Sequence, residues 1–376
     1  MSEVHGTCSD RFADVGEVLR RSLESGDDLG ASVAVTLDGE MVVDLWGGFA
    51  DHERTAAWER DTITNVWSTT KTMTALCALL LVDRGELDPY APVAKYWPEF
   101  AAEGKTAIEV RHLMSHTAGL PGWDQPITVE DLYDWEKATS LLAAQAPWWP
   151  AGTASGYHAV TQGYLVGEVV RRITGESLGS FFARELAGPL RADFHIGLDP
   201  AEFHRVSDVV PPPPLSAAVE PGTLAHRALS NPPLDASVSW SEPWRRAEIP
   251  AANGHGNARS VAAVQTALCC EGEVGGRRLF SPKVVEVVMT EQINGTDLVL
   301  GTPLRHGIGY GLVSPEIPLS PNPRACYWGG WGGSVVVIDV DARMTFAYMM
   351  NKMYTGLVGD LRGFNLLVAT HAALAR

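Results

Sequence analysis

Ser68 and Lys71 lie three residues apart and form the first pair in this chain whose types and spacing suggest chemistry. Residues three apart on a helix share one face, so the amine would lie beside the hydroxyl. A serine hydroxyl is a weak nucleophile until a neighbouring base removes its proton. A buried lysine could be that base, because burial disfavours its charged form. The pair therefore suggests nucleophilic catalysis, whereas the simpler interpretation makes Ser68 only the cap of a helix.

The segment that would position this pair spans residues 66–87. Strong helix formers follow Ser68, and Gly85 lies where the helix would end. The start of such a helix offers backbone N–H groups and a positive dipole end, which suit a developing oxyanion. Apolar residues recur at spacings of three and four, which predicts a helix with one buried stripe: Met73, Leu76, Cys77, Leu80 and Leu81.

Tyr157 is a second candidate, because a Pro-x-Gly turn at residues 150–152 precedes it and a predicted helix over residues 160–173 follows it. A phenol at such a junction between loop and helix can project into a cleft. By itself, Tyr157 is more simply explained as an aromatic residue at the edge of the core. Its importance therefore depends on what the rest of the chain offers.

A third candidate is the glycine-rich segment 327–334, which contains Trp328, Gly329, Gly330 and Trp331 and runs into a predicted strand. Glycines in a strand usually mark a close approach of the backbone to another group. One use of that approach is an edge strand that presents a backbone N–H to a substrate carbonyl. The alternative is a bulged edge strand with two surface indoles.

Together, the three segments resemble the serine β-lactamase-like superfamily of penicillin-recognising hydrolases. Within it the chain looks most like the β-lactamase-fold carboxylesterases, often called family VIII esterases, and their class C β-lactamase relatives. The S-x-x-K motif of Ser68 and Lys71 is a signature of β-lactamases and penicillin-binding proteins. The resemblance covers most of the chain, namely the segments 12–46, 67–87, 112–120, 150–175 and 328–339.

This resemblance implies a role for each candidate residue. Ser68 matches the nucleophile, Lys71 its activating neighbour, and Tyr157 the tyrosine of the Y-x-N motif. The backbone N–H groups of Ser68 and Trp331 match the oxyanion hole. Residues 328–330 occupy the place of the lactamase K-T-G motif.

Two departures from the lactamase pattern bear on the substrate. Ala159 stands where Y-x-N has its asparagine, and Trp328 stands where K-T-G has its lysine. An indole in place of a cation removes an anion anchor, which favours uncharged esters over penicillins. We also predict a crowded aromatic cleft that suits short acyl chains. Its predicted substrate-binding residues are Trp328, Gly329, Gly330, Trp148, Trp149 and His158.

The two ends of the chain predict the fold class. Residues 10–25 predict a helix, and Asp38-Gly39 between two β-rich runs, 31–37 and 41–46, predicts a hairpin. Strands over 335–340 and 344–350 and a helix over 356–375 close the chain. We therefore expect an α+β, β-lactamase/transpeptidase-like fold, with an antiparallel sheet flanked by N- and C-terminal helices and a mainly helical inserted domain. The predicted α/β domain comprises residues 1–75 and 275–376, and the insert comprises 76–274.

The middle of the chain is predicted to be helical, with one long proline-rich loop over residues 199–257 that forms a wall of the site. Ser177 fits the G-x-S-x-G motif, but it follows a helix rather than a strand, so we predict a helix cap. Ser260 is predicted to cap a later helix that ends near residue 270. The other predicted elements are helices over 108–116, 129–146 and 177–187 and a strand over 307–313.

The composition narrows the classes of partner. The chain has 376 residues, 45% hydrophobic and 20% charged, and a formal net charge of −16. This acidic balance argues against nucleic acid and anionic membrane as partners. Five cysteines without a C-x-x-C pair argue against a disulfide framework or a zinc ribbon. No apolar run is long enough to span a membrane, and the first residues lack a secretory signal pattern, so we expect a cytoplasmic enzyme.

We predict neither a metal nor a cofactor, since His112 and His116 fall in a segment similar to the superfamily's "LLxHTSGL" and are expected to pack and cap. The predicted function is a serine hydrolase that cleaves short-chain carboxylic esters through an acyl-Ser68 intermediate. The base could be neutral Lys71, or a Tyr157 phenolate beside a charged Lys71. The alternatives left open are a β-lactamase, D-peptidase or linear amide hydrolase, an acyltransferase, and a ligand sensor. The expected partner is a small ester, with no prediction of oligomeric state.

Overall fold

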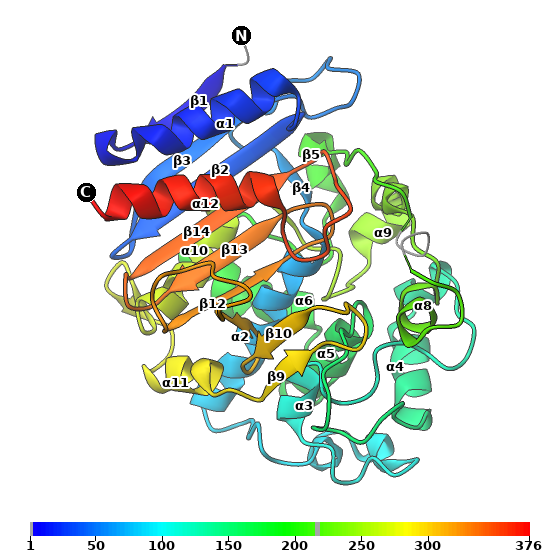
Figure 1. Cartoon of the computed structure of the whole chain (residues 1–376). Coiled ribbons are helices and arrows are strands. Elements are labelled where there is room, and N and C mark those ends of the chain that lie inside the picture. The colour runs from blue at the N-terminus through cyan, green and yellow to red at the C-terminus, as the bar shows by residue number, and fades with distance from the viewer. Residues whose placement is uncertain (1–2, 215–218) are drawn as a thin grey trace.

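The structure, a computed structural model, describes residues 3–214 and 219–376. Its centre is an antiparallel sheet made from both ends of the chain (Figure 1). Among the described residues it has nine strands: β1 (Val4–Cys8), β2 (Gly30–Leu37), β3 (Glu40–Gly48), β9 (Ile293–Thr296), β10 (Pro303–His306), β11 (Gly311–Leu312), β12 (Ala325–Gly329), β13 (Val335–Asp339) and β14 (Met344–Met350). Their order across the sheet is β1–β3–β2–β14–β13–β12–β11–β10–β9.

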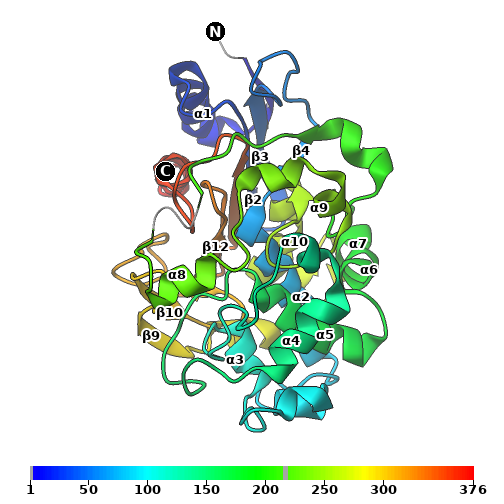
Figure 2. The ribbon, with the colours of Figure 1, turned by 90° about the vertical axis from the view of Figure 1, so that its right-hand side faces the viewer.

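Helices cover both faces of this sheet (Figures 1 and 2). The terminal helices α1 (Ala13–Ser25) and α12 (Leu361–Leu374) lie side by side on one face. On the other face, α10 (Ala258–Cys269) packs against β2, β13 and β14, and α2 (Thr70–Asp83) lies beyond it, towards the helical part. The predicted α+β class, with a β-lactamase-like sheet between terminal helices, is confirmed.

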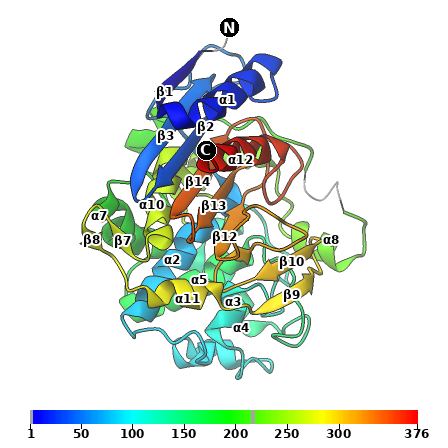
Figure 3. The ribbon, with the colours of Figure 1, turned by 60° about the vertical axis from the view of Figure 1, so that its left-hand side comes forward.

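The hairpin of β2 and β3 shows why the N-terminal part of the sheet forms. Leu37 pairs with Glu40, so Asp38 and Gly39 make the two-residue turn that the sequence predicted. Both have positive φ, 51° and 88°, which is the conformation that Asp-Gly favours in such turns. Because β2 also pairs with β14, the two ends of the chain share one sheet, while β9 and β10 form its far edge (Figure 3).

The middle of the chain supplies most of the remaining elements. The helices are α3 (Val110–Met114), α4 (Trp135–Ala144), α5 (Thr161–Thr174), α6 (Leu178–Phe182), α7 (Gly188–Leu190), α8 (Leu224–Leu229), α9 (Glu242–Arg246) and α11 (Lys283–Met289). Short strands make a three-stranded sheet of β5 (Val206–Ser207), β4 (Ile63–Asn65) and β6 (His255–Gly256), and a hairpin of β7 (Glu273–Val274) and β8 (Arg277–Arg278). The predicted domain division stays a prediction, and α10, which it placed in the insert, packs on the main sheet.

The structure corrects the prediction for α2. The sequence predicted one buried stripe, but every residue from Thr70 to Leu81 is buried. The positions between the predicted stripe residues are small or carry hydroxyls that find partners inside the protein. Thr74 Oγ1, for example, donates to the Pro250 carbonyl at 2.6 Å. A helix whose side chains are apolar or hydrogen-bonded on every side lies inside a protein. The rest of the protein therefore packs around α2 on all sides.

Three other predicted elements differ at their boundaries. The helix predicted over 129–146 begins only at Trp135, because Asp134 accepts the Lys137 N–H and caps it. The strand predicted over 307–313 is interrupted by a turn in which Gly307 donates to the Tyr310 carbonyl. Asn257, rather than Ser260, is the N-cap of α10. Ser177, by contrast, caps α6 as predicted and accepts the Ser180 N–H.

The proline-rich segment 199–257 is not one continuous loop, because α8 and α9 form within it; residues 215–218 of that segment lie outside the described part. Thr223 and Ser241 cap these two helices, and Pro243 lies in the first turn of α9, where a proline needs no N–H partner. Across residues 3–214 and 219–376, no helix has both the length and the apolar character needed to cross a membrane.

Candidate active site

Ser68 lies in the 3-10 turn Trp67–Thr69 that leads directly into α2. Lys71 occupies the first turn of that helix, and its Nζ lies 3.0 Å from Ser68 Oγ. The structure therefore brings the two residues together as their spacing predicted. Trp67, just before Ser68, has a φ of 51°, a conformation that is uncommon for a bulky residue and that clusters at functional sites.

Tyr157 completes the cluster from a distant part of the chain. Its hydroxyl lies 2.5 Å from Ser68 Oγ and 3.1 Å from Lys71 Nζ. Lys71 and Tyr157 are buried, whereas Ser68 keeps 8% of its surface exposed. The serine is thus the most exposed member of the cluster.

The surroundings of Lys71 favour the neutral amine. Burial holds the pKa of Lys71 well below its usual value, and none of the described residues brings a carboxylate within salt-bridge distance of Nζ. Nζ also lies 2.6 Å from the Ala159 carbonyl and 2.9 Å from the Ala251 carbonyl. A neutral amine has two N–H donors for these two carbonyls and one lone pair left for the Ser68 hydroxyl.

Burial acts on Tyr157 in the opposite sense. It raises the pKa of the Tyr157 phenol above its usual value, and the hydrogen bond with Ser68 only partly offsets this. The phenol is therefore protonated at neutral pH and donates to Ser68 Oγ. Ser68 in turn can donate its own proton to Lys71, so the three groups form one hydrogen-bonded chain.

The turn between β12 and β13 lies against the start of α2. Ser334 Oγ donates to the Val66 carbonyl at 2.9 Å and lies 2.9 Å from Thr69 Oγ1. Gly330 must be glycine for this approach, since an added Cβ would lie 2.4 Å from the Val66 carbonyl oxygen. Ser68 and Trp331, whose backbone N–H groups are predicted to form the oxyanion hole, belong to the two segments that meet here, and that role stays a prediction.

Trp328 lies inside the protein next to this cluster. Its ring stacks on His116 at 5.3 Å and lies 5.8 Å from the Tyr157 ring. It belongs to an apolar group that we call the site wall, in which α8 and the loop after β9 take part. The site wall comprises Tyr157, Ala228, Leu229, Val299 and Trp328, with the partly buried Trp148, Ala159, Val219, Leu224 and Leu300.

The other predicted substrate-binding residues either belong to the site wall or pack against other parts of the protein. Trp148 is part of the site wall, where the Arg227 guanidinium lies 3.8 Å from its ring centre. Trp149 packs behind the Tyr157 segment, against Gly156, and donates to the Ala154 carbonyl. The Cβ direction of Gly329 is filled by the backbone of residues 358–359, so Gly329 faces away from Ser68.

The prediction that His158 contacts the substrate stays a prediction, and in the structure its ring contacts only other parts of the protein among the described residues. The ring is buried, Nε2 accepts the Leu120 N–H at 3.0 Å, and Nδ1 donates to the Gly156 carbonyl at 2.6 Å. Both nitrogens are therefore occupied within the protein, and burial lowers the pKa of His158 to about 4. Its role is to hold backbone in place. His112 acts similarly, since Nδ1 accepts the Glu109 N–H at the start of α3.

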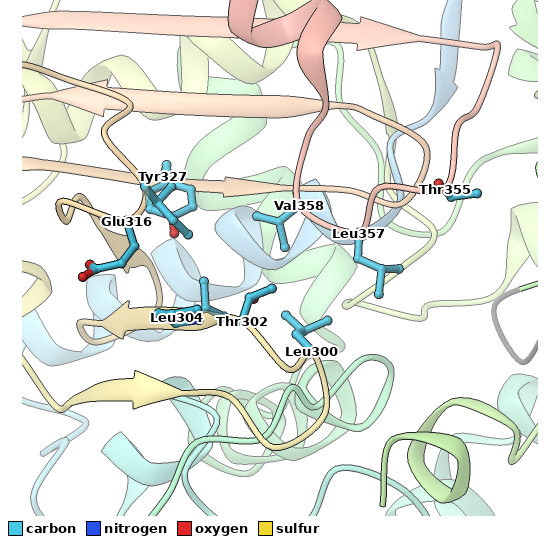
Figure 4. Close-up of a pocket in the computed structure, with 10 residues that line it drawn as sticks. Leu300, Thr302, Leu304, Glu316, Tyr327, Thr355, Leu357 and Val358 are labelled. Atoms are coloured by element: carbon cyan, nitrogen blue, oxygen red, sulfur yellow. The ribbon is translucent and has the colours of Figure 1, made fainter. Parts of the chain in front are cut away.

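An apolar cavity of about 490 Å³ lies on the other face of β12 (Figure 4). Tyr327, Leu304, Leu357 and Val358 contribute to its lining. Tyr327 and Trp328 are neighbours on one strand, so their side chains point to opposite faces of the sheet. The cavity therefore lies on the opposite face of β12 from Trp328, and Leu300 belongs both to its lining and to the site wall.

Sequence reasoning missed several residues that shape the site. Ser334 and Asp297 lie in segments without regular periodicity, and His306 ends β10. Asp297 is buried and accepts the Tyr157 N–H at 3.0 Å. The signal in the sequence is an aspartate two residues before the apolar pair Val299 and Leu300, a pattern that is too common to be specific.

Comparison with known proteins identifies the family and the fold. The model of the family described as "Beta-lactamase" matches residues 16–370. The chain is 35% identical to Esterase/beta-lactamase LipL of Mycobacterium tuberculosis, over 96% of this chain and 86% of the relative. A crystal structure of a family VIII carboxylesterase matches with a TM-score of 0.94 and 41% identity, over 99% of this chain and all of that one. A penicillin-binding protein homologue from Caulobacter crescentus matches with a TM-score of 0.92 and 38% identity, over 99% and 100% of the two chains.

Proposed function

This chain belongs to the beta-lactamase family, and we propose that it is a carboxylesterase, a serine hydrolase that cleaves short-chain carboxylic esters through an acyl-Ser68 intermediate. The observation that carries the proposal is that Ser68 Oγ lies within hydrogen-bond distance of both Lys71 Nζ and the Tyr157 hydroxyl. A nucleophile in contact with a base and a proton donor is the arrangement that acyl transfer requires.

Acylation begins when neutral Lys71 takes the proton of Ser68. Ser68 Oγ then bonds to the ester carbonyl carbon, and the carbonyl oxygen, now an oxyanion, accepts from the N–H groups of Ser68 and Trp331. As the bond from carbon to the alcohol oxygen breaks, the Tyr157 hydroxyl gives its proton to that oxygen. Tyr157 recovers a proton from the Lys71 ammonium, 3.1 Å away, and the free alcohol leaves acyl-Ser68 behind.

Deacylation repeats these transfers with water in place of the alcohol. Water gives a proton through Tyr157 to Lys71 while its oxygen bonds to the acyl carbon. When the bond from that carbon to Ser68 Oγ breaks, the serine recovers a proton from Lys71. The carboxylic acid leaves, and the three side chains return to their starting protonation states.

The pKa directions favour neutral Lys71 as the base over the Tyr157 phenolate. Burial lowers the pKa of Lys71 and raises the pKa of Tyr157, so each group is driven towards its neutral form. A phenolate beside an ammonium would require two charges in a site where burial opposes both. The two groups still titrate as a coupled pair, so a measured pKa belongs to the pair.

The apolar site wall supports an uncharged substrate. Trp328 stands where the lactamase motif has a lysine, and its buried ring offers no positive charge to a carboxylate. Leu229 and Val299 belong to the same buried apolar group as Tyr157, from which we infer a confined space beside the reacting atoms. Short acyl chains fit such a site better than long ones.

A comparison of two chromogenic substrates tests this function. We expect kcat/KM for p-nitrophenyl acetate to exceed that for nitrocefin by about 10- to 150-fold, because a missing charge-assisted hydrogen bond costs about 1.5–3 kcal/mol. A series of p-nitrophenyl esters should show kcat/KM falling as the acyl chain lengthens. Comparable values for nitrocefin would support a β-lactamase, and covalent labelling without turnover would support a ligand sensor.

The pH dependence tests the choice of base. Lys71 acts as base only when it is neutral, so kcat/KM should rise with pH as Lys71 loses its proton. Because the pKa of Lys71 is lowered, the rise should end well below the usual lysine pKa of about 10.4. The measurement is kcat/KM for a non-ionisable ester, corrected for spontaneous hydrolysis. A rate that still increases tenfold per pH unit around pH 9 would contradict a neutral Lys71 base.

A further inference from the structure

The backbone around Tyr157 lies in neither a helix nor a strand, since α5 begins only at Thr161. Something other than regular structure must therefore hold the phenol 2.5 Å from Ser68 Oγ. Distant residues do so through hydrogen bonds, among them His116 and Asp297. The His116 carbonyl accepts the Gly156 N–H at 3.0 Å, and Asp297 Oδ1 accepts the Tyr157 N–H at 3.0 Å.

Asp297 is completely buried, and its Oδ1 atom has more than one role. The same oxygen accepts the N–H groups of Val299 and Leu300, each at 2.9 Å. The next residue, Leu298, donates to the Ser155 carbonyl at 2.8 Å. One carboxylate oxygen thus joins the Tyr157 backbone to the segment that supplies Val299 and Leu300 to the site wall.

The second oxygen of Asp297 shows that this carboxylate is not placed for ordinary ion pairing. Oδ2 has no hydrogen-bond partner in the described chain, nor does His306 Nε2, which lies 3.9 Å from it. Burial lowers the pKa of His306 to about 4, so the imidazole is neutral and does not balance the carboxylate. Burying a carboxylate without a cation costs free energy, and the three N–H groups that Oδ1 accepts offset part of that cost.

We propose that Asp297 is a positioning residue for the ester hydrolysis. Its Oδ1 holds the backbone of Tyr157 in a fixed position relative to the backbone of Val299 and Leu300. The inference rests on the proposed function of Ser68 and Tyr157. Asp297 does not contact the reacting atoms, and it acts by holding the phenol where it can pass a proton to the leaving alcohol. Loss of this contact would misplace the proton donor without removing it.

The test uses Asp297→Ala and Asp297→Asn, with Asp339→Ala as the matched control. Asp339 is equally buried and likewise accepts a backbone N–H, from Ala342 at 2.8 Å. It pairs with Ala325, at the other end of the β12–β13 hairpin from Gly329. The control therefore loses a buried carboxylate that orders a loop, but one remote from Ser68.

We expect Asp297→Ala to lower kcat for p-nitrophenyl acetate by about 100-fold, the loss that a misplacement of about 1 Å can cause. Asp297→Asn should recover most of this loss, because the amide oxygen can still accept the three N–H groups. Asp339→Ala should stay within about threefold of the parent enzyme, since its site is independent of the reaction. Circular dichroism and thermal unfolding establish that each variant is folded, and rapid-mixing measurements of the acylation burst locate the loss in the chemical step.

Two results would overturn the proposal. One is a folded Asp297→Ala enzyme with kcat within about threefold of Asp339→Ala. The other is an Asp297→Asn enzyme that is folded and as slow as Asp297→Ala. Asparagine keeps the acceptor oxygen on which the proposal depends, so the proposal requires it to restore kcat. Either result leaves the proposed function intact if the activity still depends on Ser68. Activity that persists without Ser68 would instead remove the proposed function.

Discussion

Replacement of Ser68 by alanine is expected to lower kcat for short-chain esters by about 10⁴-fold or more, since removal of a nucleophile abolishes the covalent route. The Lys71 amine and the Tyr157 phenol would remain in place, but neither would have a hydroxyl to activate. The fold should persist, because the substitution removes one small side chain that keeps 8% of its surface exposed. The measurement is steady-state hydrolysis of p-nitrophenyl acetate by purified, folded enzyme.

Ser177→Ala is the matched control for this experiment. Ser177 lies in a G-x-S-x-G motif, but its hydroxyl accepts the Ser180 N–H and caps α6. We expect full esterase activity and a loss of about 1 kcal/mol of stability from the missing cap. Normal turnover by Ser68→Ala, or loss of turnover by a folded Ser177→Ala, would contradict the assignment of the nucleophile.

Replacement of Lys71 by methionine is expected to lower kcat/KM by about 10³- to 10⁴-fold, near the upper end of what a general base contributes. Methionine has a similar length and apolar character, so the buried space stays filled. The carbonyls of Ala159 and Ala251 lose their donor, and thermal unfolding should report that separate cost. Hydrolysis at several pH values distinguishes a lost base from a shifted pH optimum.

Lys71→Arg tests whether the positive charge or the basic lone pair is required. An arginine supplies a fixed positive charge and N–H donors but cannot act as a base near neutral pH. If neutral Lys71 is the base, we expect the arginine enzyme to be about as slow as the methionine enzyme. A folded arginine variant with more than about a tenth of the parent activity would favour the Tyr157 phenolate as base, since a fixed cation stabilises it.

The parts of the structure that follow from local rules were predictable. The three-residue spacing of Ser68 and Lys71 places both on the start of one helix, and Asp38-Gly39 forms the expected hairpin turn. The serine of the misleading G-x-S-x-G motif forms a cap because it lies next to a helix. In each case, neighbours within four residues determine the conformation.

Features that depend on distant contacts were not predictable from one sequence. The Thr side chains of α2 look like solvent-facing positions until Pro250 and other partners bury them. His158 looks like a free imidazole beside Tyr157, but Leu120 and Gly156 occupy both nitrogens. Asp297 acts across 140 residues of chain, and no spacing rule connects it with Tyr157.

The most direct test of the account is to identify the atom that becomes acylated. The parent enzyme is mixed with excess p-nitrophenyl acetate, quenched in acid within the first turnover, digested and analysed by mass spectrometry. The account predicts one acetyl group on the peptide that contains Ser68, and none on the same peptide from Ser68→Ala. An acetyl group on any other residue, formed at the rate of turnover, would contradict it.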